Sequence, residues 1–193
     1  MKRPLFFCAA LSVTAILAFP QQSPDRFLGF KLGSDRNLAG YSQIKAYFQQ
    51  LSLESPRVRT VTLGKTTKGN DLFLAVISSA DNLKELEKYT AITRQLAQAE
   101  VEPEAAEQLA AGGKAIVVVT CNLHSTEIAS SQMAMELGFL LASAKSQEIR
   151  DILDNVILVL FPSVNPDGQI MEVEWYDKTK NTEYEGTGAP YLY

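Results

Sequence analysis

The chain has 193 residues, of which 46% are hydrophobic and 21% are charged, a composition typical of a globular protein whose length suits one domain. Its formal net charge of −4 argues against a nucleic-acid-binding protein, so no nucleic-acid partner is expected. A mean hydropathy of −0.03 and a single long apolar run exclude a protein with several membrane spans.

Residues 1–20 have the pattern of a secretory signal peptide. Two basic residues precede an uncharged run, residues 5–19, which has the length of a signal core and is short for a membrane span. We expect cleavage near residues 18–22 and export to a periplasmic or extracellular location, with no stable membrane span. An uncleaved N-terminal anchor is the alternative. Cleavage would leave Cys121 as the remaining cysteine, and its place after an apolar run predicts a buried free thiol.

The next segments predict a linker, a helix and a hairpin. Residues 21–40 are polar and are expected to link the signal peptide to a domain that spans residues 41–193. Apolar side chains at helical spacing predict a helix over residues 41–51. An alternating segment, 58–63, and an apolar segment, 72–77, flank a turn-rich stretch and predict a β-hairpin.

Two helices are expected in the polar segment that follows. Asn82 and Glu85 have the spacing of a capping box and predict a helix over residues 83–99. Pro103 suits the start of a second, shorter helix, which is expected to end at Gly112.

The second half of the chain has the pattern of a strand–helix–strand unit. Residues 115–120 and 156–161 are continuous apolar runs, as expected of strands buried on both faces. A helix predicted over residues 128–144 has an apolar stripe on one side, and a short helix predicted over 147–153 begins after Ser146. The stripe comprises Met133, Leu137, Leu140, Leu141 and Ala144. The two strands should be parallel, so we predict an α/β fold with three α/β/α layers and a mixed, largely parallel sheet.

Two polar loops follow these predicted strands. Because parallel strands end at one edge of a sheet, where ligands bind in open α/β folds, both loops should lie at that edge. Residues 121–127 contain His124, which is the single histidine of the sequence, and residues 162–168 contain an Asn-Pro-Asp-Gly turn. His124 and Asn165 each lie four residues beyond their strand, which predicts that they lie near one another.

His124 and Glu127 are three residues apart at the expected start of a helix. That spacing lets an imidazole and a carboxylate face one centre, and zinc binds both kinds of ligand. The alternative is a surface histidine beside a carboxylate that favours the helix dipole. The second loop has a similar alternative, because Asn-Pro and Asp-Gly are common in turns of any function.

In combination, these motifs resemble those of the zinc carboxypeptidase family. In that family H-x-x-E follows one buried strand and N-P-D-G follows a later parallel strand; here they read HSTE at 124–127 and PSVNPDG at 162–168. The segment 64–77 (GKTTKGNDLFLAVI) is similar to the family's early hairpin, although Asn70 stands where arginine is common. The resemblance covers roughly residues 40–178 and implies a carboxypeptidase-like domain, of which this chain would be the N-terminal part.

The resemblance implies that His124 and Glu127 are two of the three protein ligands of a zinc cofactor. The third ligand would be a second histidine downstream, which this sequence lacks, and the general-base glutamate is expected beyond residue 193. No catalytic residue is therefore assigned within the chain, and residues 165–168 would shape the rim of the site. Residues 175–178 (WYDK) occupy the place of a family segment whose arginine polarises the scissile carbonyl, a role that we assign to no residue here.

The function implied by the resemblance is that of a zinc metallocarboxypeptidase, which hydrolyses the C-terminal peptide bonds of peptides or proteins. This chain would be a truncated portion, expected to bind zinc weakly and to have little or no turnover, since it provides two ligands. One alternative is a related zinc amidase that acts on muropeptides or acylated amino acids. The other is a non-catalytic binding module or a decayed enzyme.

Overall fold

The computed structural model describes residues 21–99 and 101–190. The predicted signal peptide, residues 1–20, lies outside the described residues. None of the helices in the described part combines the length and the apolar character that a membrane crossing requires.

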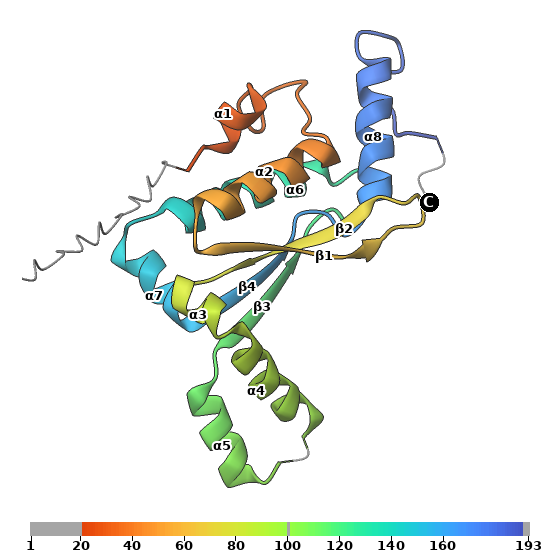
Figure 1. The fold of residues 1–193 in the computed structure, drawn as a ribbon. Helices are drawn as coiled ribbons and strands as arrows, with labels where there is room; N and C mark the ends of the chain where they lie inside the picture. Colours follow the sequence, from red (N-terminus) through yellow and green to blue (C-terminus); the bar gives the residue numbers. More distant parts are fainter. Residues whose placement is uncertain (1–20, 100, 191–193) are drawn as a thin grey trace, which may run out of the picture.

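The described residues form eight helices and four strands, which Figure 1 shows in chain order. They are α1 (Pro24–Leu28), α2 (Tyr41–Glu54), β1 (Val58–Lys65), β2 (Asp71–Ile77), α3 (Ala80–Lys84), α4 (Leu86–Gln98), α5 (Pro103–Gly112), β3 (Ala115–Thr120), α6 (Ile128–Ser143), α7 (Gln147–Asn155), β4 (Val156–Phe161) and α8 (Pro166–Thr179).

The four strands form one mixed sheet in the order β1-β2-β4-β3. β1 pairs with β2 and β2 pairs with β4 in antiparallel fashion, whereas β4 and β3 are parallel. The predicted hairpin and the predicted parallel pair are confirmed. The expectation of a largely parallel sheet is not met by the described residues, because two of their three strand pairings are antiparallel.

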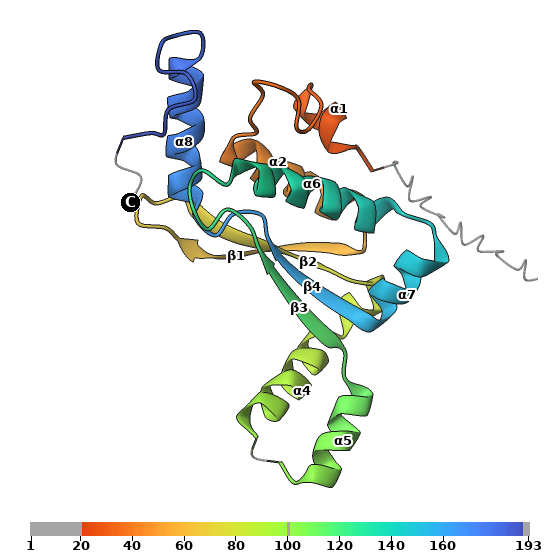
Figure 2. The ribbon, with the colours of Figure 1, turned by 180° about the vertical axis from the view of Figure 1, so that it is seen from behind.

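Helices α2 and α6 cover one face of the sheet, as Figures 1 and 2 show from opposite sides. The larger hydrophobic core lies beneath them and combines side chains of both helices with side chains of β2 and β4. Gly138 of α6 faces Phe48 of α2, and a Cβ atom added at Gly138 would lie 2.8 Å from the Phe48 ring. The glycine therefore allows the two helices to approach closely.

The opposite face of the sheet is covered by α3 and the start of α4. Leu83 and Tyr89 pack there against a smaller cluster formed by Leu74, Val76 and Ile157. Beyond this contact, α4 and α5 form a helical pair that projects away from the sheet (Figure 1). The described residues therefore form an α/β fold in which helices contact both faces of a mixed sheet.

Most of the predicted helices are present, but the one predicted over residues 83–99 is divided into α3 and α4. The cap of α3 is Ser79, whose hydroxyl accepts a hydrogen bond from the backbone of Asn82. The predicted cap role of Asn82 is wrong, because its buried side chain instead donates to the carbonyl oxygen of Leu153 at 3.0 Å. A contact with the end of α7 thus outweighs the local capping pattern.

The burial predicted for β3 is also wrong. β3 is an edge strand, and Val117 and Val118 are 43% and 59% exposed. The predicted stripe of α6 is displaced as well, since Met133 and Leu140 are exposed. The buried face comprises Ile128, Ser131, Gln132, Ala134, Met135, Gly138, Leu141 and Ala142. The inclusion of polar residues on this face explains why an apolar pattern did not identify it.

Residues 21–40, expected to be a linker, include helix α1, which lies beside α2 and α6. The Phe27 ring packs edge-on against Tyr47, with ring centroids 5.3 Å apart. The Gln22 backbone N–H also donates to the Glu54 carboxylate at 2.9 Å. This segment therefore packs against the domain over part of its length.

Candidate functional site

The two loops that follow β3 and β4 lie side by side at one edge of the sheet. Backbone hydrogen bonds continue the strand pairing beyond its end, from Cys121 N–H to Phe161 and from Val164 N–H to Cys121, both at 2.9 Å. The Asn165 side-chain amide donates to the Leu123 carbonyl at 3.2 Å. The predicted proximity of the two loops is confirmed. Cys121 is buried and free, as predicted, and burial raises the pKa of its thiol.

His124 and Glu127 face one another at the start of α6. The His124 Nδ1 atom lies 2.8 Å from Glu127 Oε1, and the His124 backbone N–H donates to Glu127 Oε2 at 3.1 Å. The side-chain hydrogen bond with His124 is the main cause that lowers the pKa of Glu127. Both side chains are accessible, with exposed fractions of 73% and 48%. The imidazole and the carboxylate are therefore close to one another and open to a ligand.

The donor atoms of this pair suit zinc, which binds imidazole nitrogen and carboxylate oxygen. Their 2.8 Å separation can be spanned by an ion that binds each at about 2 Å. Within residues 21–99 and 101–190, no group of three His, Cys, Asp or Glu residues is arranged to hold a metal. His124 and Glu127 thus fit zinc as two ligands of an incomplete set.

A buried polar network underlies the first loop. Asn122 adopts a left-handed conformation, with φ of 54°, and is 1% exposed. Its side-chain amide donates to Ser163 Oγ at 3.1 Å and to Gln169 Oε1 at 3.4 Å. Ser130 Oγ accepts the Asn122 backbone N–H at 2.8 Å. These bonds connect the His124 loop to the second loop and to α6 and α8, so the loop is held rather than free.

The Asn-Pro-Asp-Gly segment is the start of α8, a helix that the sequence analysis did not predict. The Asn165 side chain caps the helix by accepting the Gly168 backbone N–H at 3.0 Å. A Cβ atom at Gly168 would lie 2.6 Å from the Asn165 amide nitrogen, so the glycine leaves space for the cap. Asparagine at the cap and proline in the first turn are typical helix-start residues, and this signal was available in the sequence.

Asp167 connects the second loop to the turn of the β1–β2 hairpin. Its carboxylate accepts hydrogen bonds from Thr66 Oγ1 at 2.6 Å, from the Asn70 side-chain amide at 2.8 Å and from the Lys68 backbone N–H at 3.1 Å. Partial burial raises the pKa of Asp167, but the bonds from Asn70 and Thr66 outweigh it and hold the pKa below its ordinary value. The hairpin turn, which carried no predicted site residue, is thereby fixed beside the two loops.

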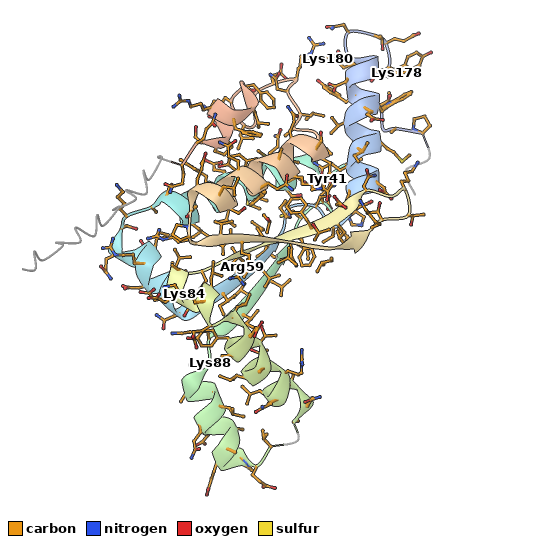
Figure 3. All side chains as sticks on the ribbon, viewed as in Figure 1. Tyr41, Arg59, Lys84, Lys88, Lys178 and Lys180 are labelled. Atoms are coloured by element: carbon orange, nitrogen blue, oxygen red, sulfur yellow. The ribbon has the colours of Figure 1, made fainter. Side chains whose placement is uncertain are left out.

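These elements line a cavity of about 830 Å³. Its walls are formed by Lys68, Leu123, His124, Ser125, Thr126, Asn165, Asp167, Gly168, Met171, Gly188 and Ala189. Of residues 165–168, Asn165, Asp167 and Gly168 thus line the cavity, whereas Lys178 does not. Figure 3 shows Lys178 near the far end of α8, and its amino group lies 6.0 Å from the centre of the Trp175 ring.

Comparisons with known proteins agree with this arrangement. The family model "Zinc carboxypeptidase" matches residues 44–189, and no curated protein matches the chain. Carboxypeptidase A from Helicoverpa armigera aligns with a TM-score of 0.50 and 22% identity, over 76% of this chain and 31% of that one. Thrombin activatable fibrinolysis inhibitor aligns with a TM-score of 0.53 and 12% identity, over 79% of this chain and 32% of that one. These structures show a shared fold, and this chain spans about a third of their length.

Proposed function

Because the chain belongs to the zinc carboxypeptidase family, whose model it matches over residues 44–189, we propose that it supplies His124 and Glu127 as two ligands of zinc. The protein then hydrolyses the C-terminal peptide bonds of peptides and proteins. The signal-like sequence of residues 1–20 supports a periplasmic or extracellular site of action.

The observation that carries this proposal is the paired geometry of His124 and Glu127, of which His124 lines the cavity. A zinc ion at such a site supplies Lewis-acid chemistry, activating water and polarising a carbonyl group. Glu127 receives two hydrogen bonds from His124, which orient its carboxylate toward the imidazole. The hydrogen bonds of Asn122 hold the backbone of the same loop, so the side chains of His124 and Glu127 extend from a fixed backbone.

The third zinc ligand and the general base are assigned to no residue of this chain. A non-catalytic binding module or a decayed enzyme is therefore the second candidate, favoured by the two-donor set among the described residues. The two candidates share the cavity and differ in whether peptide bonds are cleaved. A zinc titration and a cleavage assay separate them.

The first test measures zinc binding by competition with a chromogenic chelator. We expect one weak zinc site per chain, whose affinity for zinc falls about tenfold or more in His124→Ala and in Glu127→Gln. The loss of a ligand should lower this affinity more than the loss of a residue that only hydrogen-bonds to a ligand. Glu136→Gln, an exposed glutamate on the same helix, is the matched control and should bind zinc as the wild type does. Unchanged binding in both site variants would contradict the proposed ligands.

The second test follows release of C-terminal residues from peptides by mass spectrometry, using the protein as its host produces it. We expect release that a chelator abolishes and that His124→Ala removes. Zinc binding without any release, under conditions where the control variant also binds zinc, would favour the binding module.

A further inference from the structure

The cavity beside His124 contains one lysine, Lys68, and no arginine among the described residues that line it. Lys68 lies in the turn between β1 and β2, nearly sixty residues before His124 in the sequence. Its amino group makes no ion pair with a carboxylate in the described part of the chain, whereas the neighbouring Lys65 pairs with Asp71. Lys68 therefore brings to the cavity an ammonium group that has no ion-pair partner among the described residues.

The backbone of this turn is fixed in two ways. Within the turn, Thr66 N–H donates to the Asn70 carbonyl at 2.8 Å, and Gly69 N–H donates to the Thr66 carbonyl at 2.9 Å. From outside, Asp167 accepts three hydrogen bonds from Thr66, Lys68 and Asn70. The backbone of Lys68 is thus held in place beside the cavity, whereas its side chain is exposed.

Asp167 is the one carboxylate among the described residues that line the cavity, and neither it nor Glu127, which follows Thr126 of the lining, forms an ion pair with Lys68. Asp167 lines the cavity, but the turn itself supplies the three hydrogen bonds that its carboxylate accepts. Glu127 accepts two hydrogen bonds from His124 and is a proposed zinc ligand. Thr126, between His124 and Glu127, is neutral. The charged side chains of the described lining are therefore Lys68 and Asp167, and Lys68 is the one cation among them.

We propose that Lys68 is the anion-binding residue of this cavity and selects substrates that present a carboxylate there, with Asp167 as the positioning residue. An ammonium group offers three donors and a point charge, and its hydrogen bonds to carboxylates are stronger than neutral ones. This inference rests on the proposed function, since it assigns part of the substrate specificity of the same site. The carboxylate belongs either to an acidic side chain or to the C-terminus of the peptide.

The experiment is a titration of the isotope-labelled chain, followed by NMR, in the presence of a zinc chelator. Three N-acetylated peptides are compared: one with a central glutamate and an amidated C-terminus, one of alanines with a free carboxylate, and one with a central glutamine and an amidated C-terminus. We expect signals of residues 66–70 and 123–126 to shift with a carboxylate peptide and not with the neutral one. The peptide that shifts them identifies the source of the carboxylate.

Substitutions test the two assigned roles. Lys68→Gln should weaken carboxylate binding about tenfold, as expected for loss of a charge-assisted hydrogen bond. Lys31→Gln, an exposed lysine outside the cavity, should leave it unchanged. Asp167→Asn should weaken binding in the wild type but add nothing in the Lys68→Gln background, a coupling that a general loss of stability does not produce. Raised salt should weaken binding to the wild type.

Equal binding by the wild type and Lys68→Gln, or equal binding of the neutral peptide, would overturn the inference. Because zinc is chelated throughout, these outcomes are independent of the zinc titration. If carboxylate binding depends on Lys68 but zinc binding does not depend on His124, only the proposed function is refuted. Zinc binding that depends on His124, without carboxylate binding, would refute this inference alone.

Discussion

The two edges of the sheet, β1 and β3, differ in the kind of surface they present. β1 reads VRTVTLGK: it carries two basic residues, and its pairing with β2 shifts register between Thr62 and Gly64. β3 reads AIVVVT, carries no charge, and pairs with β4 in unbroken register. Both strands are largely exposed, so the difference lies in sequence and regularity rather than in burial.

The comparison shows that one edge is protected against pairing with another strand and the other is not. Charged side chains and bulges hinder the addition of a strand to a sheet edge, whereas a regular apolar edge favours it. β3 also leads directly into the loop that holds His124. The edge beside the candidate site is therefore the one most open to a further β-strand.

The largest expected effect separates the centre of the sheet from its β3 edge. Leu160 of β4 is 0% exposed, and Leu160→Ala should lower the free energy of unfolding by about 2–5 kcal/mol, because it leaves a cavity in the core. Val118→Ala on the adjacent strand should change it by less than about 0.5 kcal/mol. Urea unfolding of both variants measures the difference. Equal losses in the free energy of unfolding would mean that β3 is covered in solution, and that it does not differ from the centre of the sheet in burial.

A smaller effect is expected on self-association. Val118→Lys adds a charge to the unprotected edge and should reduce association of the chain several-fold, whereas Thr62→Lys on the already charged β1 edge should not. Sedimentation velocity over a concentration series measures both. A wild type that is monomeric at every concentration, or an equal response to both substitutions, would argue against the difference between the edges.

The smallest effect concerns pH and the end of the β1 edge. Asp71 pairs with Lys45 and Lys65, and hydrogen bonds from Lys45 and then Lys65 lower its pKa from 3.8 to about 2. A carboxyl group whose pKa is lowered on folding stabilises the fold above its unfolded pKa, and this contribution is lost as the pH falls toward 2. Asp71→Asn should therefore lower Tm slightly near neutral pH and progressively less below about pH 4.

Calorimetry at several pH values measures this change. The difference between the wild type and Val118→Ala should stay constant with pH, because the β3 strand has no titratable side chain. A Tm difference for Asp71→Asn that is independent of pH would show that the ion pairs contribute nothing to stability.

Particular residues show how far the sequence predicted the site. The spacing of His124 and Glu127, together with two apolar strands joined by a helix, predicted one sheet edge with two neighbouring loops. The contacts of Asn122 and Asp167 were not predictable, because their partners lie up to 101 residues away and share no local pattern with them. α8 was missed for a different reason: Asn, Pro, Asp and Gly favour turns and helix starts alike.

Local patterns in the sequence determined the family, the hairpin, the parallel strand pair and the histidine–glutamate pair, because each depends on residues close in the chain or on the order of the elements. The tertiary structure alone decided which strand is buried. β3 and β4 are similarly apolar, yet only β4 has neighbours on both sides, and burial depends on position in the sheet rather than on composition. It also decided that the hairpin turn with Lys68 borders the cavity, since only folding brings Thr66, Lys68 and Asn70 to Asp167.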